Sequence, residues 1–183
     1  TYPHVDLALT GALAATLLVS AAELEFRYTA EAPHAEGYLT RALKIEPENR
    51  RAALRLEAVG RKRGRFGELA ELYEDRIKRA KTDRERVAAM IALAEVKVSE
   101  LGQKDAALEI FRRALLLEPA NPRLLEHLTS HYERVGNWSQ LVLIYEGALK
   151  VGHALLGEGA EAGMLLQIAM IHWKRLSNIA AAA

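Results

Sequence analysis

The chain has no cysteine, and its 183 residues include only five prolines. Without cysteine it cannot form a disulfide, use a thiol nucleophile or bind zinc or an iron–sulfur cluster through thiolates. It also lacks a glycine-rich phosphate loop, a nucleophile elbow and a paired-carboxylate arrangement. We therefore expect a protein that is not an enzyme and has no catalytic residues, cofactor or metal.

The sequence also offers little for a membrane span. Residues 7–22 are uncharged and rich in alanine and leucine, but Asp6 precedes them where a signal peptide would carry basic residues. A spanning helix needs about 20 apolar residues, so we expect a buried helix of a repeat here and no span. Because the chain begins at Thr1 rather than Met, we expect a fragment of a longer protein. The compartment stays open, with the cytoplasm preferred.

Positive and negative charges nearly balance over the whole chain, which has a net charge of +1. The distribution is uneven: residues 50–86 contain 13 Lys/Arg and 7 Asp/Glu, a local +6, whereas the rest contains 12 and 17, hence −5. A basic middle between acidic ends can be a partner surface. We prefer the simpler interpretation that these charges lie on solvated helix faces.

What the sequence does contain is a repeat. The segment 41–49 reappears in similar form at 113–121, 72 positions later, each copy with a Glu-Pro-x-Asn ending. A second pattern is a glycine followed by an aromatic residue nine positions on, and it occurs as Gly64/Tyr73, Gly102/Phe111 and Gly136/Tyr145. The steps between successive glycines are 38 and 34 positions. A period near 34 without strand patterning is typical of stacked helical hairpins.

The helix start and stop signals place these hairpins. Asn121 followed by Pro122 predicts a helix start, Gly102 a helix end and Asp83 an N-cap. The predicted helices cover residues 12–30, 33–46, 49–63, 66–80, 84–101, 104–117, 122–135, 138–151 and 159–176. They form units at about 12–47, 48–81, 83–119 and 121–152 and a partial unit at 159–183, after a glycine-rich linker at 151–159. In the last helix we expect Leu166, Ala169 and Trp173 to face inward, and residues 179–183 to begin an unfinished helix.

The core pattern Ala107-x3-Phe111, with Ala114, Pro119 and the preceding Gly102, resembles the tetratricopeptide repeat family. Tyr132, Gly136, Tyr145 and Ala148 repeat the resemblance in the next unit. The first-helix positions depart from the family's Trp, Leu-Gly and Tyr. The resemblance covers nearly the whole chain and implies an all-α superhelix of about four units that acts as a scaffold for protein partners. Half-repeat scaffolds of RNA processing place Trp and Tyr similarly, so that alternative stays open.

The resemblance also implies where a partner binds, because the first helix of each unit normally lines the concave side. The candidate groove residues are Arg51, Leu54, Arg55, Ala92, Val96, Arg123, Glu126, His127, Gln167 and Ile171. We expect apolar contacts from Leu54, Ala92, Val96 and Ile171, with the arginines selecting an acidic peptide or helix. A clamp for a terminal carboxylate is disfavoured because no asparagine projects there.

Three further groups of residues bear on an alternative function, a metal site and the burial of a carboxylate. The alternative function is an RNA-associated helical-repeat scaffold that uses the basic region 50–86, although nucleic acid is the less favoured partner. Within this region Arg61, Lys62, Arg63 and Arg65 form a compact basic turn. His127 and His131 are separated by one helical turn, but without a third ligand we expect ordinary histidines rather than a metal site. Glu95 stands where the family prefers a small residue, and we expect it to reach solvent. Exposed apolar ends also predict self-association.

Overall fold

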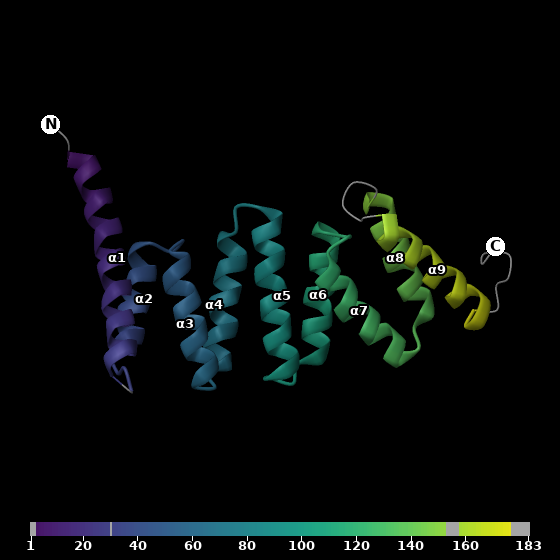
Figure 1. Cartoon of the computed structure of the whole chain (residues 1–183), viewed down its shortest axis with the longest axis horizontal. Helices are drawn as coiled ribbons and strands as arrows, with labels where there is room; N and C mark the ends of the chain where they lie inside the picture. Colours follow the sequence, from purple (N-terminus) through teal and green to yellow (C-terminus); the bar gives the residue numbers. More distant parts are fainter. Residues whose placement is uncertain (1–2, 30, 153–157, 177–183) are drawn as a thin grey trace. The chain divides into compact units, whose positions relative to one another are not determined.

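The computed structural model describes residues 3–29, 31–152 and 158–176. Within these ranges the elements of secondary structure are all α-helices, joined by turns (Figure 1). The helices are α1 Pro3–Tyr28, α2 Ala35–Ile45, α3 Arg50–Lys62, α4 Phe66–Arg79, α5 Asp83–Ser99, α6 Lys104–Leu117, α7 Pro122–Val135, α8 Trp138–Gly152 and α9 Glu158–Lys174. The predicted all-α fold class is confirmed. The boundaries of the repeat units stay a prediction.

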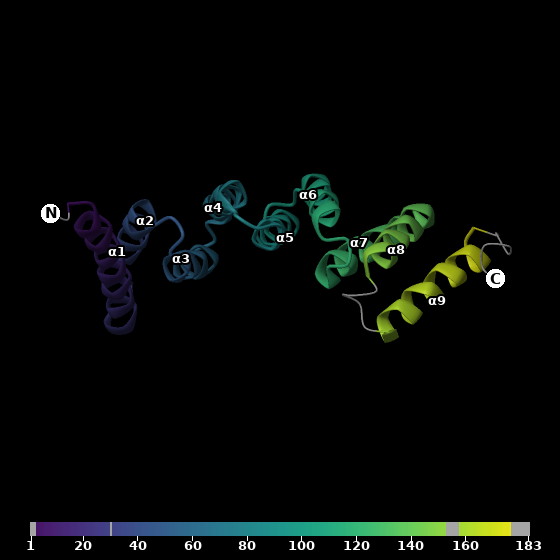
Figure 2. The same cartoon turned by 90° about the horizontal axis from the view of Figure 1, so that it is seen from above.

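The chain divides after Leu69 into two compact units, and we call residues 1–69 the first unit and residues 70–183 the second. In the first unit α1, α2 and α3 pack in chain order, and in the second α5 to α9 do the same. Seen from above, α5, α7 and α9 of the second unit lie on one side of their row and α6 and α8 on the other (Figure 2). We call α1, α3, α5, α7 and α9 the A helices and the others the B helices.

The repeated Glu-Pro-x-Asn sequence starts a helix in each unit. The Asn49 side chain accepts a hydrogen bond from the Ala52 N–H at 2.9 Å and donates one to Glu46 at 2.8 Å. Its counterpart Asn121 accepts from the N–H groups of α7 and donates to Glu118 at 2.6 Å. Each asparagine therefore caps an A helix and is itself held by the preceding glutamate. The twice-written sequence thus encodes a junction between helices.

The recurring glycine ends an A helix. Gly64, Gly102 and Gly136 have φ of +68°, +66° and +69°, in the left-handed region that side chains with a Cβ rarely adopt. Gly136 accordingly forms the C-cap of α7. Because each glycine turns the chain directly into the next B helix, the Gly-to-aromatic spacing places the aromatic ring at a fixed position on that helix.

Each unit has its own hydrophobic core. In the second unit Ala107, Phe111 and Ala114 of α6 are buried with residues from α5, α7 and α8. In the first unit the equivalent positions of the repeat are occupied by Ala35, Leu39 and Ala42, which pack with α1 and Ala52. Small residues let the helices approach closely while the larger side chain fills the space between them.

Some local predictions were wrong. Helix α5 is capped by the Thr82 hydroxyl, which accepts from the Glu85 N–H at 3.2 Å, rather than by Asp83. In α9, Leu166 and Trp173 are 63% and 57% exposed rather than inward-facing. Ile171, which is 5% exposed, belongs to the core of the second unit, and Met164 and Ile168 of α9 pack against this core while partly buried. The predicted start of a further helix at 179–183, and residues 153–157 of the linker, lie outside the described residues.

Two A helices expose rows of large apolar side chains. These side chains are Leu13, Leu17, Leu24 and Tyr28 in α1, and Leu165, Leu166, Met170 and Trp173 in the middle and C-terminal part of α9. Surfaces of this kind are typical of contacts with another protein. Self-association through them stays a prediction.

Candidate partner-binding surface

A carboxylate joins the two A helices of the first unit. Glu23 of α1 accepts hydrogen bonds from Nε of Arg51 at 2.8 Å and Nε of Arg55 at 3.2 Å, both on α3. The hydrogen bond from Arg51, followed by that from Arg55 and the charge of both guanidinium groups, lowers the pKa of Glu23 against the opposing effect of desolvation. Both arginine side chains remain more than half exposed.

The second unit builds the same arrangement. Glu95 of α5 accepts from Nη2 of Arg123 at 2.5 Å and lies 3.0 Å from Nε2 of His127, both on α7. The His127 ring also stacks on Phe111 of α6, with ring centroids 4.5 Å apart and planes inclined by 18°. This contact fixes the imidazole between the core aromatic ring and the carboxylate.

The two clusters are related by the repeat. In the register that superimposes 41–49 on 113–121, Glu95, Arg123 and His127 align with Glu23, Arg51 and Arg55. Each bond in one unit has a counterpart in the other, and each joins successive A helices. We call these sets the Glu23 cluster and the Glu95 cluster.

The expectation that Glu95 reaches solvent was incomplete. Its side chain is 27% exposed and is held by Arg123 and His127. A half-buried carboxylate needs such partners, because desolvation without them is costly. The register of the repeat could have predicted both clusters, because it aligns Glu23 with Glu95 and Arg51 with Arg123.

The predicted groove residues divide into an accessible and a buried set. Arg51, Leu54, Arg55, Arg123, Glu126 and Gln167 are exposed, and Ala92 and His127 are half-buried. Val96 and Ile171 are buried, with exposures of 0% and 5%, so the expectation that they contact a partner is corrected. Ile171 belongs to the hydrophobic core of the second unit. Residue spacing alone could not distinguish these buried positions from exposed ones.

The basic turn is largely neutralised inside the first unit. Nη1 of Arg63 lies 2.7 Å from Glu36, Arg65 pairs with Glu36 and with Glu68, and Arg61 pairs with Glu57. The hydrogen bond to Glu36 raises the pKa of Arg65. Lys62 is exposed and enters no ion pair among the described residues. The turn therefore offers less free positive charge than its sequence suggests.

The two histidines of α7 have different neighbours. His127 faces Glu95 and Phe111, whereas the ring of His131 meets Tyr132 edge-on at 5.2 Å. Burial and the charges of Arg134 and Arg112 lower the pKa of His131, although Asp105 acts in the opposite direction. Among the described residues no group of three His, Cys, Asp or Glu side chains could hold a metal ion.

Comparison with known proteins identifies one segment. Residues 124–157 match the family model described as tetratricopeptide repeat. The matched segment begins in α7 and extends through α8. No curated protein matches this chain. In the part of the chain that the structure describes, none of the helices has the length and apolar character that crossing a bilayer requires.

Proposed function

Because this chain is a tetratricopeptide-like helical repeat, we propose that it is a non-catalytic scaffold that binds an acidic peptide or helix on its A-helix surface. Repeats of this family serve in general as non-catalytic platforms for protein or peptide partners. The observation that carries the finer proposal is the repeated arrangement of exposed arginines on an A helix of each unit, Arg51 and Arg55 on α3 and Arg123 on α7.

The accessible side chains of these helices have the mixed character that such a partner needs. In the first unit Leu54 is half exposed between the two arginines of the Glu23 cluster. In the second, Arg123, Glu126 and Gln167 are exposed and Ala92 is half-buried. An amphipathic partner would place an apolar side chain against the aliphatic surface and carboxylates against the guanidinium groups.

The internal carboxylates support this proposal rather than oppose it. The side chains of Arg51 and Arg123 remain 63% and 64% exposed, although they pair with Glu23 and Glu95. A guanidinium group has five N–H donors, so it can hold an internal and an external carboxylate together. Each internal bond also restricts the arginine side chain, which lowers the entropic cost of binding a partner.

The test is capture of partners from lysate with and without nuclease. The variant carries Arg51→Ala, Arg55→Ala and Arg123→Ala. Its matched control removes three exposed cations from B helices through Arg41→Ala, Arg113→Ala and Lys150→Ala. We expect protein partners that survive nuclease, are lost by the A-helix variant and are kept by the control. Equal loss from both variants would contradict an A-helix surface.

The nuclease arm also decides the alternative of an RNA-associated scaffold. If capture depends on RNA, it should weaken steeply with salt and disappear when Arg61, Lys62, Arg63 and Arg65 are neutralised. The pairing of this turn with Glu36, Glu57 and Glu68 leaves it with less support than the A-helix surface.

A further inference from the structure

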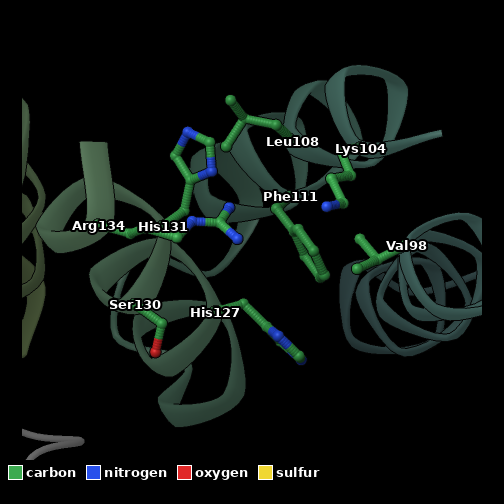
Figure 3. Close-up of a pocket in the computed structure, with 8 residues that line it drawn as sticks. All are labelled: Val98, Lys104, Leu108, Phe111, His127, Ser130, His131 and Arg134. Atoms are coloured by element: carbon green, nitrogen blue, oxygen red, sulfur yellow. The ribbon is translucent and has the colours of Figure 1, made fainter. Parts of the chain in front are cut away.

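The second unit contains a pocket that the A-helix clusters do not explain. It has a volume of about 290 Å³ and lies where the end of α5 meets α6 and α7 (Figure 3). Its lining comes from all three helices: Val98 from α5, Lys104, Leu108 and Phe111 from α6, and His127, Ser130, His131 and Arg134 from α7. Ligand sites for whole cofactors or drug-sized molecules span roughly 300–1,000 Å³. This pocket lies at the lower limit of that range, so it has room for one or two side chains of a partner.

The polar side chains of the pocket are cationic or neutral, and none of its lining residues is acidic. Figure 3 shows the Lys104 amine and the Arg134 guanidinium directed into the pocket from opposite sides, with Phe111 between them. Among the described residues neither Lys104 nor Arg134 forms an ion pair. Two unpaired cations that converge on one apolar space favour an anion there, because nearby positive charges repel each other until an anion binds.

The apolar part of the lining narrows the choice of ligand. Leu108 is partly buried against the core, and Phe111 and Val98 complete an apolar wall next to the cations. A free inorganic ion would leave that wall in contact with water. A peptide that carries an acidic and an apolar side chain would cover both parts.

The first unit supplies a precedent for the anion. In the register of the repeat Leu108 aligns with Glu36, and Arg134 aligns with Lys62. In the first unit the Glu36 carboxylate is bound by Arg63 and Arg65, directly after Lys62. The first unit thus places a carboxylate of its own chain at the turn that ends an A helix. In the second unit Leu108 stands in place of Glu36, and Val135 and Asn137 stand in place of Arg63 and Arg65. The cations of the pocket, Lys104 and Arg134, form no ion pair among the described residues.

We propose that this pocket binds the carboxylate side chain of an acidic peptide, with a neighbouring apolar residue of the peptide against Leu108 and Phe111. The inference rests on the proposed scaffold function and adds a second point of contact to the A-helix surface. The carboxylate interacts with Lys104 and Arg134, and His131 stands beside them.

The titration of His131 offers a readout of occupancy. Burial, Arg134 and Arg112 lower the pKa of its imidazole, while Asp105 raises it, and Lys104 is the other charged group from α6 that lines the pocket. From α5 the pocket receives only Val98. A bound carboxylate offsets the surrounding positive charge, so it raises the pKa of His131. Binding therefore takes up protons and tightens as the pH falls toward the range where His131 titrates.

The experiment uses the ¹⁵N-labelled whole chain and three probes. The first is acetyl-Leu-Glu-Leu-amide, the second its Gln counterpart, and the third is inorganic phosphate. We expect the Glu peptide to shift the amide signals of residues 104–111 and 127–134 and to raise the pKa of His131. The Gln peptide should bind about tenfold more weakly, since it loses the charge-assisted bonds. Both peptides are capped, so no terminal carboxylate contributes.

Three variants locate the site. Lys104→Gln combined with Arg134→Gln should weaken the Glu peptide about tenfold or more. Arg113→Gln, a matched control on the same helix as Lys104 but outside the pocket, should leave the affinity unchanged. Leu108→Glu gives the second unit the carboxylate that Glu36 supplies in the first, and it should block the peptide while α6 remains folded, since Glu is a good helix former.

The outcomes separate the pocket from the A-helix surface. Equal affinity for the Glu and Gln peptides, or shifts produced by phosphate but not by the Glu peptide, would overturn the proposal. If Arg123→Ala abolishes Glu-peptide binding and the pocket variants do not, the pocket inference fails while the proposed function stands. If the pocket binds the peptide as expected but lysate capture is the same for both triple variants, the A-helix proposal fails and the pocket remains.

Discussion

The two units use the same repeated sequence and differ in the charges placed upon it. The first unit closes its Glu23 cluster with two arginines, whereas the second closes its Glu95 cluster with Arg123 and the imidazole of His127. The second also stacks that imidazole on Phe111, where the first has Leu39. The backbone junctions are shared, so the difference lies in the side chains of one surface.

The two units differ more in charge near the C-terminal ends of α3 and α7. In the first unit Arg63 and Arg65 bind Glu36, so positive charge is neutralised by the chain itself. In the second unit Leu108, His131 and Arg134 line an open pocket instead. The residues that set the helix junctions, and the pairs Glu23–Arg51 and Glu95–Arg123, are therefore retained between the units. Other surface residues are replaced, with Leu108 in place of Glu36 and His127 in place of Arg55. That division is what a repeat protein needs when one architecture must present different surfaces.

Substitutions in the two hydrophobic cores should have the largest effect on the free energy of unfolding. Leu39→Ala removes a fully buried side chain from the first unit, and Phe111→Ala removes its counterpart from the second. We expect the free energy of unfolding to fall by about 2–5 kcal/mol and about 3–5 kcal/mol. Urea titration followed by circular dichroism measures both, and the fluorescence of Trp138 and Trp173 reports the second unit. A loss below about 1 kcal/mol for either variant would contradict the core described for its unit.

The caps should behave alike in the two units. Asn49→Ala and Asn121→Ala each remove the acceptor at the start of an A helix and the bond to a preceding glutamate. We expect each to lower the free energy of unfolding by about 1 kcal/mol. Asn→Ser at the same positions retains a cap oxygen without placing a second negative charge against Glu46 or Glu118, so it serves as the control. A cost at one site but not at the other would show that the repeated junction does not contribute equally.

The sequence predicted the helices well because local signals specify them. Residues 104–117 form α6 as expected, Asn121 caps α7, and Gly136 ends it in the left-handed conformation. These features depend on residues within a turn or two of each other, so the sequence contains them directly. The buried positions of Ala107, Phe111 and Ala114 follow from the helical period in the same way.

Surface residues were harder to predict because their environment depends on the next helix. Val96 and Ile171 were expected in the groove and are buried, while Leu166 and Trp173 were expected inside and are exposed. Spacing shows which residues share a face but not which face the neighbouring helix covers. The pairing of Glu95 with residues of the next A helix, and the pocket beside Leu108, depend on packing between helices for the same reason.

The two charge clusters should contribute little to stability in either unit. Double-mutant cycles on Glu23 with Arg51 and on Glu95 with Arg123 should each give a coupling of about 0.2–1 kcal/mol, because one partner of each pair is largely exposed. His127→Arg makes the second cluster resemble the first and should leave the unfolding free energy within about 0.5 kcal/mol of the parent. A coupling above about 2 kcal/mol in either unit would mean that the cluster is a structural element rather than a partner surface.

The smallest effect is expected at His131, whose counterpart in the first unit is Val59. Since burial and the charges of Arg134 and Arg112 lower the pKa of His131, the unfolded chain binds this proton more tightly than the folded chain does. The stability that the group contributes is complete above the ordinary imidazole pKa of about 6.5 and decreases as the pH falls through the lowered value. His131→Val should therefore flatten the pH dependence of the unfolding free energy between about pH 7.5 and pH 5, and an NMR titration of the His131 ring in the parent should give a pKa below the ordinary value. A His131 pKa at or above that value in the unliganded protein would mean that the pocket already holds compensating negative charge, and the contrast between the two units would disappear.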